Sequence, residues 1–107
     1  MKSFPVLLAA SFLAGAVVAA FAAEKTITQK GRMFSVADIT IKTGDTLVFF
    51  NDDNVAHNIY SESPGNDFNL GSQAPGSSVP VTFDKSGEVD IQCAIHPLMK
   101  MKVKVTN

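Results

Sequence analysis

VDIQCAIHPLMKMKVKV, residues 89–105, has the clearest strand pattern in the chain. Apolar and polar residues alternate from Val89 to Cys93, and they alternate again from Met99 to Val105, where lysines take every second place. A period of two puts successive side chains on opposite faces of a strand. The stretch therefore predicts two strands, each with one buried face, joined by a short loop.

Other segments have the same character. Residues rich in β-branched and aromatic types, which suit a pleated sheet, occur at 34–41, 46–50, 57–61 and 79–83. A phase slip near Ala37 and Asp38 is typical of a β-bulge. Turn residues separate the segments, above all in the long connection 63–78, and no segment keeps a helical period over three turns. The pattern predicts an all-β fold, an antiparallel sandwich.

The N-terminus differs in composition from the rest of the chain. Lys2 precedes an uncharged run over residues 4–23, and Ala20-Phe21-Ala22 near its end fits a signal peptidase site. We expect residues 1–23 to be a cleavable signal peptide that directs export to the periplasm, with 24–107 as the single domain. An uncleaved membrane anchor is the alternative, because the run is nearly long enough to span a bilayer.

The net charge and the cysteine content limit the kinds of function that the chain can have. Without Lys2, the 9 Lys plus Arg become 8 against 10 Asp plus Glu, a formal charge of −2, so no basic face for nucleic acid is expected. Cys93 is the one cysteine, so the chain forms no internal disulfide. A lone cysteine in an exported protein is a buried inert thiol, an intermolecular bridge or a metal ligand.

The two histidines and the cysteine favour the metal ligand. His57 opens a predicted strand, Cys93 ends another, and His96 follows three residues later, with Met99 three residues after that. One short loop can therefore wrap an ion that the distant His57 completes. A thiolate, two imidazoles and a weak thioether are the ligands of electron-transfer copper. Zinc is the alternative for the same residues, although methionine suits zinc poorly.

The chain resembles the cupredoxins, the small blue-copper proteins, and among them the amicyanin and plastocyanin group. The resemblance rests on VADITIKTGDTLVFFN (36–51), HNI (57–59), FDKSGEVDIQC (83–93) and the short loop CAIHPLM (93–99). It implies a Greek-key antiparallel β-sandwich that holds one copper. By position, His57, Cys93 and His96 would be the strong ligands. Asn58 would tie the two ligand-bearing loops together through its side chain.

Two methionines compete for the axial position. Short-loop relatives place the ligand three residues after the histidine, at Met99, whereas longer-loop relatives place it five after, at Met101. The Lys102, Val103 and Val105 register of similar proteins favours Met99. The chain departs from the family pattern at Ala56 and Ile95, which stand where prolines usually precede the ligand histidines.

The resemblance implies a one-electron carrier and not an enzyme. We expect a monomer that passes electrons between redox proteins, such as a cytochrome, a dehydrogenase or an oxidase. Pro97 and Leu98 would form an apolar docking patch around an exposed edge of His96. The alternative is a periplasmic copper carrier without redox cycling, which the absence of a Met- or His-rich tract disfavours.

Overall fold

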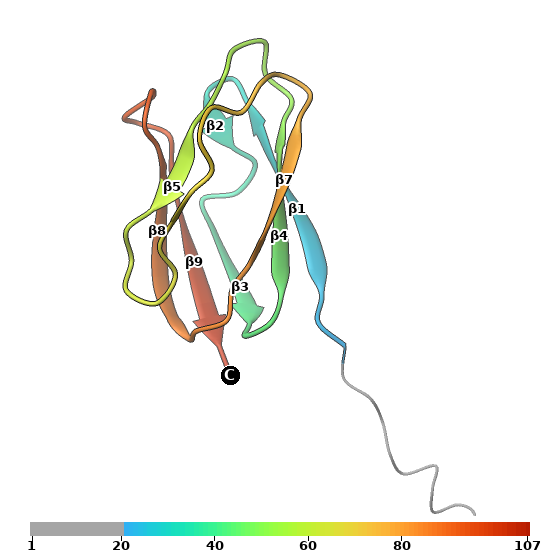
Figure 1. The fold of residues 1–107 in the computed structure, drawn as a ribbon, viewed down its shortest axis with the longest axis vertical. Coiled ribbons are helices and arrows are strands. Elements are labelled where there is room, and N and C mark those ends of the chain that lie inside the picture. The colour runs from blue at the N-terminus through green and yellow to red at the C-terminus, as the bar shows by residue number, and fades with distance from the viewer. Residues whose placement is uncertain (1–20) are drawn as a thin grey trace, which may run out of the picture.

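The computed structural model describes residues 21–107, so the predicted signal peptide lies outside the described residues except for its last three positions. The described part contains nine strands and no helix (Figure 1). They are β1 (Glu24–Lys30), β2 (Met33–Phe34), β3 (Asp38–Lys42), β4 (Thr46–Asn51), β5 (Ile59–Ser61), β6 (Phe68–Asn69), β7 (Ser78–Thr82), β8 (Gly87–Cys93) and β9 (Lys100–Thr106). Over residues 21–107 no helix could therefore cross a membrane.

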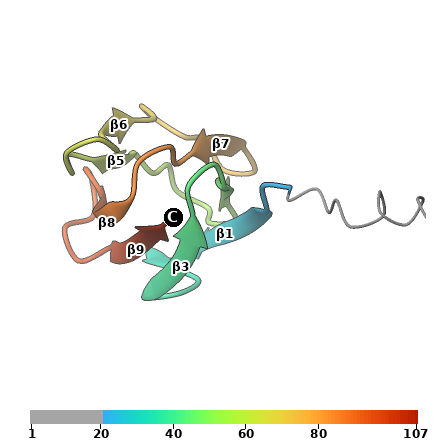
Figure 2. The same ribbon diagram turned by 90° about the horizontal axis from the view of Figure 1, so that it is seen from below.

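The strands form two sheets that enclose one core. The first sheet has the order β2-β1-β4-β7, and the second has the order β3-β9-β8-β5-β6. Figure 2 looks along the strands and shows the two sheets around a common interior. The predicted all-β sandwich is confirmed.

Two strand pairs are parallel, so the prediction of a purely antiparallel sandwich is wrong. β1 runs parallel to β4 from Glu24↔Thr46 to Gln29↔Asn51, and β3 runs parallel to β9. Parallel neighbours cannot be joined by a hairpin and need a crossover. Here the chain crosses from the first sheet to the second over residues 35–37, between β2 and β3. The phase slip near Ala37 and Asp38 thus marks a change of sheet and not a bulge.

β1 was not predicted from the sequence. Only two of its positions are fully buried, Ile27 and Gln29, and one of those is polar. The Gln29 amide donates to Gln73 Oε1 at 3.0 Å, which offsets part of the cost of burying it. Because that partner is distant in the sequence, no local pattern could identify β1.

The core follows the alternation seen in residues 89–105. Every second residue of β8 and β9 is buried, while Lys100, Lys102 and Lys104 face solvent. Phe49 and Phe83 are fully buried, and Phe68 packs against both, with ring centroids 6.4 Å and 6.1 Å away. Each fully buried aliphatic or phenyl side chain contributes about 1.5–3 kcal/mol relative to exposure. Cys93 and Met99 lie at one end of this core.

Candidate metal centre

Three predicted site residues come from different parts of the fold. Cys93 is the last residue of β8, His96 lies on the loop that leads to β9, and His57 precedes β5. His57 is held by a two-way main-chain bridge to Gln73, with N···O distances of 3.1 Å and 2.7 Å. The folded chain therefore brings His57 to residues that lie 36 and 39 positions away in sequence.

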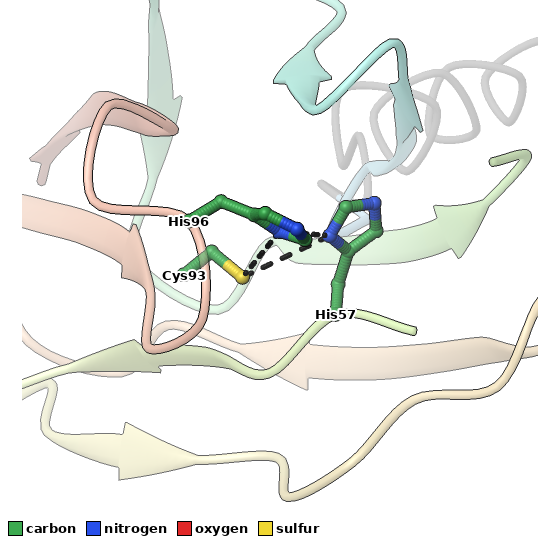
Figure 3. Close-up of side chains that lie close together, drawn as sticks. All are labelled: His57, Cys93 and His96. Atoms are coloured by element: carbon green, nitrogen blue, oxygen red, sulfur yellow. Dashed lines mark hydrogen bonds between the residues drawn. The ribbon is translucent and has the colours of Figure 1, made fainter. Parts of the chain in front are cut away.

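The donor atoms of these three residues converge (Figure 3). The Nδ1 atoms of His57 and His96 are 3.1 Å apart. The Cys93 Sγ lies 3.8 Å from the first of them and 3.6 Å from the second. Atoms bound to one ion at about 2.0–2.3 Å have separations of this size. The three side chains thus fit a single metal ion.

The chemistry of these donors fits copper. A thiolate sulfur is a soft ligand that suits Cu(I), and imidazole nitrogen suits both common oxidation states. His57 is fully buried and Cys93 is 3% exposed, whereas His96 is partly exposed. Such a site has one face toward solvent, and that face is the edge of His96.

Main-chain hydrogen bonds hold the loop that carries His96. The Ala94 N–H donates to Asn58 O at 2.8 Å, and the Met99 N–H donates to His96 O at 2.9 Å. The Cys93 N–H donates to Met99 O at 3.2 Å, which places Met99 across from Cys93 at the start of β9. Main-chain hydrogen bonds therefore tie the loop to the β8–β9 ladder and to the segment before β5.

Asn58 links the two ligand-bearing loops through its main chain and not through its side chain. Its N–H points at the Cys93 Sγ over 3.4 Å, and its carbonyl accepts from Ala94. The Asn58 side chain instead donates to Asn69 Oδ1 at 2.9 Å, because β5 pairs with β6 on that side. The residue lies where the resemblance implies, but its side chain has a different partner.

Met99 and Met101 are both buried, at different depths in the fold. Met101 pairs with Ile91 in the β8–β9 ladder, whereas Met99 is level with Cys93. Two residues of strand separate them, which is about 7 Å along the chain. Met99 also lines the surface hollow that contains His96.

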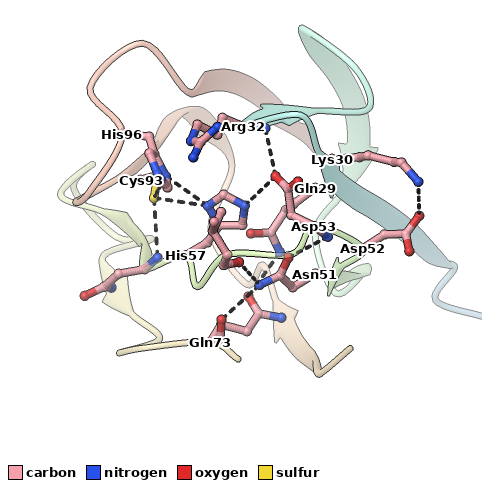
Figure 4. A network of polar contacts seen from close by, with 12 residues as sticks. Gln29, Lys30, Arg32, Asn51, Asp52, Asp53, His57, Gln73, Cys93 and His96 are labelled. Atoms are coloured by element: carbon pink, nitrogen blue, oxygen red, sulfur yellow. Dashed lines mark hydrogen bonds and ion pairs between the residues drawn. The ribbon is translucent and has the colours of Figure 1, made fainter. Parts of the chain in front are cut away.

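Asp53 is a site residue that the sequence reasoning missed. Its Oδ2 lies 3.0 Å from His57 Nε2 and accepts the Arg32 N–H at 2.8 Å (Figure 4). These hydrogen bonds, the one from Arg32 first and then the one from His57, lower the pKa of Asp53 to about 2. The only signal was the position of an acidic residue in the polar loop before His57.

The exposed edge of His96 lies in a shallow hollow of about 550 Å³. Pro97, Leu98 and Met99 line it from one loop, and 31–33 line it from the turn between β1 and β2. The predicted patch at Pro97 and Leu98 is thus larger than expected, because the structure adds Met33, which is 64% exposed. Partial burial, followed by the nearby His57 and Arg32, lowers the pKa of His96. A lower pKa favours the neutral imidazole, which is the form that binds a metal.

Comparison with known proteins agrees with this donor set. Residues 22–106 match the model of the copper binding proteins of the plastocyanin/azurin family. The methylamine utilization protein MauL of Methylophilus methylotrophus is 35% identical over 82 residues, which cover 74% of this chain and 47% of that protein. The chain spans about half the length of the curated relatives it matches.

Solved structures share the fold of this chain. A purple cupredoxin from Nitrosopumilus maritimus has a TM-score of 0.69 at 26% identity and covers 77% of this chain and 99% of its own. A reduced amicyanin variant with a single tyrosine substitution shares the fold, with a TM-score of 0.69 at 22% identity over 75% of this chain and 79% of its own. With its converging thiolate and imidazoles, the chain belongs to the plastocyanin/azurin family of copper binding proteins, and its cofactor is one copper ion.

Proposed function

We propose that this chain is a one-electron carrier whose copper is held by His57, Cys93, His96 and Met99. The observation that carries the proposal is the convergence of two Nδ1 atoms and one Sγ within 4.8 Å of one another. Copper bound there supplies a reversible one-electron couple. His57 and Cys93 are buried, and the one side toward solvent is covered by His96, itself a ligand, which supports a carrier and not an enzyme.

The residues around the site support fast electron exchange. The His57–Gln73 bridge and the bonds of the 94–99 loop hold the donors in place through the main chain. A donor set that is already in position has little to rearrange when the charge at its centre changes. Met99, whose main chain pairs with that of Cys93, would supply a weak thioether.

The surface around His96 supports docking of a redox partner. Leu98 is 94% exposed and Met33 is also an exposed apolar residue, and both line the hollow. Ile95, which precedes His96 in the sequence, is exposed as well. Exposed apolar patches with polar rims mark interaction sites. Likeness to methylamine utilization proteins supports a partner in the oxidation of that amine, such as a dehydrogenase, a cytochrome or an oxidase.

Export completes the proposal. Residues 1–23 would act as the signal peptide, and 24–107 would be the mature domain, a monomer in the periplasm. The family match begins at residue 22, close to the proposed cleavage point. The mass of the chain recovered from a periplasmic extract tests this directly. Recovery of the full-length chain in membranes would contradict it.

The proposed function is tested by titrating the metal-free chain with Cu²⁺. We expect one equivalent to produce an intense visible thiolate-to-copper band that disappears and returns with one electron per chain. Cys93→Ser is the matched control, because it replaces the sulfur by oxygen at nearly the same size and should lose the band. A colourless complex that binds Cu(I) or zinc alone would contradict the electron carrier.

A further inference from the structure

An acidic side chain stands directly behind the buried histidine of the copper site. Asp53 Oδ2 lies 3.0 Å from His57 Nε2, on the side of the ring away from Cys93 and His96. The Asp53 side chain is only 11% exposed, and the His57 side chain is fully buried. Over residues 21–107 no carboxylate makes a hydrogen bond to His96, so the two imidazoles differ in their surroundings.

The carboxylate is held from two sides. The Arg32 N–H donates to the same Oδ2 at 2.8 Å. Gly31 and Arg32 both have positive φ, 63° and 57°, as a two-residue hairpin turn of the primed type requires. This unusual conformation at Arg32 turns its N–H toward Asp53. The hydrogen bond therefore joins the β1–β2 turn to the loop that carries His57.

A buried polar network fixes the main chain on the other side. The Asp53 N–H donates to Asn51 Oδ1 at 2.9 Å. The Asn51 amide in turn donates to Val55 O at 3.0 Å and to Gln73 O at 2.9 Å. Gln73 is also the bridge partner of His57, so one network positions both the carboxylate and the ring that it contacts.

We propose that Asp53 is a positioning residue for His57 that also lowers the reduction potential of the copper. This proposal rests on the proposed function. The Asp53 carboxylate accepts a hydrogen bond from the His57 Nε2–H, so the proton stays on Nε2 and the Nδ1 lone pair is free to point at the metal position. Carboxylate–histidine–metal contacts of this kind fix the ring and raise its basicity. A negative charge behind a ligand favours the more highly charged Cu(II), and the equilibrium constant for reduction is therefore smaller.

The test removes the negative charge of Asp53 and keeps the shape of its side chain. Asp53→Asn retains an oxygen that can accept from His57 Nε2, but it removes the negative charge. We expect the equilibrium constant for reduction to rise about tenfold, which is a rise of about 59 mV in the one-electron potential. Asp52→Asn is the matched control: the same charge is removed one position away, where Asp52 only pairs with the exposed Lys30 at 3.5 Å. If both variants shift the potential equally, or neither shifts it, the tuning role is wrong.

A second measurement does not need copper. Nitrogen NMR of the metal-free chain reports which ring nitrogen of His57 carries the proton. We expect the proton on Nε2 in the parent chain and in Asp52→Asn, and a loss of this preference in Asp53→Ala. An unchanged tautomer in Asp53→Ala would overturn the positioning role. A chain that shows the Nε2 tautomer but no visible copper band would keep the positioning role and reject the electron carrier.

Discussion

Cys93 and Met99 face each other where β8 ends and β9 begins, and this pairing bears on the axial ligand. The Cys93 N–H donates to Met99 O, while Met101 pairs with Ile91 one step deeper in the core. Side chains at directly opposite positions lie about 4.5–5.5 Å apart at Cβ. This main-chain pairing places the Cβ of Met99 beside that of Cys93 and supports Met99 as the proposed axial ligand, whereas Met101 packs against the core beside Ile91.

Leucine substitution at each methionine separates the two roles. We expect Met99→Leu to change the visible copper spectrum and to raise the potential, because loss of a weak donor to Cu(II) favours Cu(I). Met101→Leu should leave both unchanged and cost less than about 1.5 kcal/mol of stability, as swaps of similar volume do. The reverse result, in which only Met101→Leu alters the spectrum, would assign the axial position to Met101.

At the scale of elements, the turn between β3 and β4 is held by one carboxylate. Asp45 accepts the Lys42 N–H at 2.9 Å across the turn, and in the unprocessed chain it also accepts the Ala23 N–H at 2.8 Å. These two hydrogen bonds, Lys42 first, lower the pKa of Asp45 below its usual 3.8. The bonds favour the ionised form in the folded state.

This shift predicts a pH dependence of stability. Because the folded pKa is depressed, the contribution of Asp45 is complete above the unfolded pKa of about 3.9 and is lost as the pH falls through the folded value. We expect Asp45→Asn to lower the urea midpoint of the metal-free chain at pH 7, and to lower it less at a pH where Asp45 is protonated. Asp84→Asn is the control, since over residues 21–107 that carboxylate accepts no hydrogen bond. An equal loss at both pH values would contradict the role of the charge.

At the scale of the whole molecule, the sandwich brings three separate segments to one end. The loop after β8 carries His96 and Leu98, β2 begins with Met33, and the loop before β5 carries His57. The loop after β8 joins two strands of the second sheet, β2 belongs to the first sheet, and the loop before β5 connects the first sheet to the second. The apolar hollow around His96 is thus a product of both sheets.

A charge in this hollow should slow electron transfer to the partner. We expect Leu98→Asp to reduce the rate about tenfold or more, because burying an unpaired charge at an interface costs more than the roughly 1.4 kcal/mol that a factor of ten represents. The potential should not change. Ser86→Asp is the control, because it adds the same charge in the exposed turn before β8, about 20 Å from the site along the strand. Equal rates for Leu98→Asp and the parent chain would show that docking occurs elsewhere.

Much of the fold and of the copper site could be predicted from local patterns in the sequence. Successive side chains of a strand point to opposite faces, so the alternation in residues 89–105 correctly predicted which face of β8 and β9 is buried. Cys93, His96 and Met99 are so close in sequence that one short loop can bring their side chains together. Together with His57, the other histidine, these cysteine, histidine and methionine side chains were sufficient to predict a metal site and to favour copper over zinc.

The rest depended on contacts between distant segments. The parallel pairing of β1 with β4, the burial of Gln29 against Gln73 and the place of Met33 beside His96 have no local signal. Asp53 meets the Arg32 N–H across 21 positions, and its bond to His57 depends on a network that includes Gln73. Periodicity reports which face of a strand is buried, but it does not report what that face meets. Packing of the two sheets therefore selected the partners that surround the copper site.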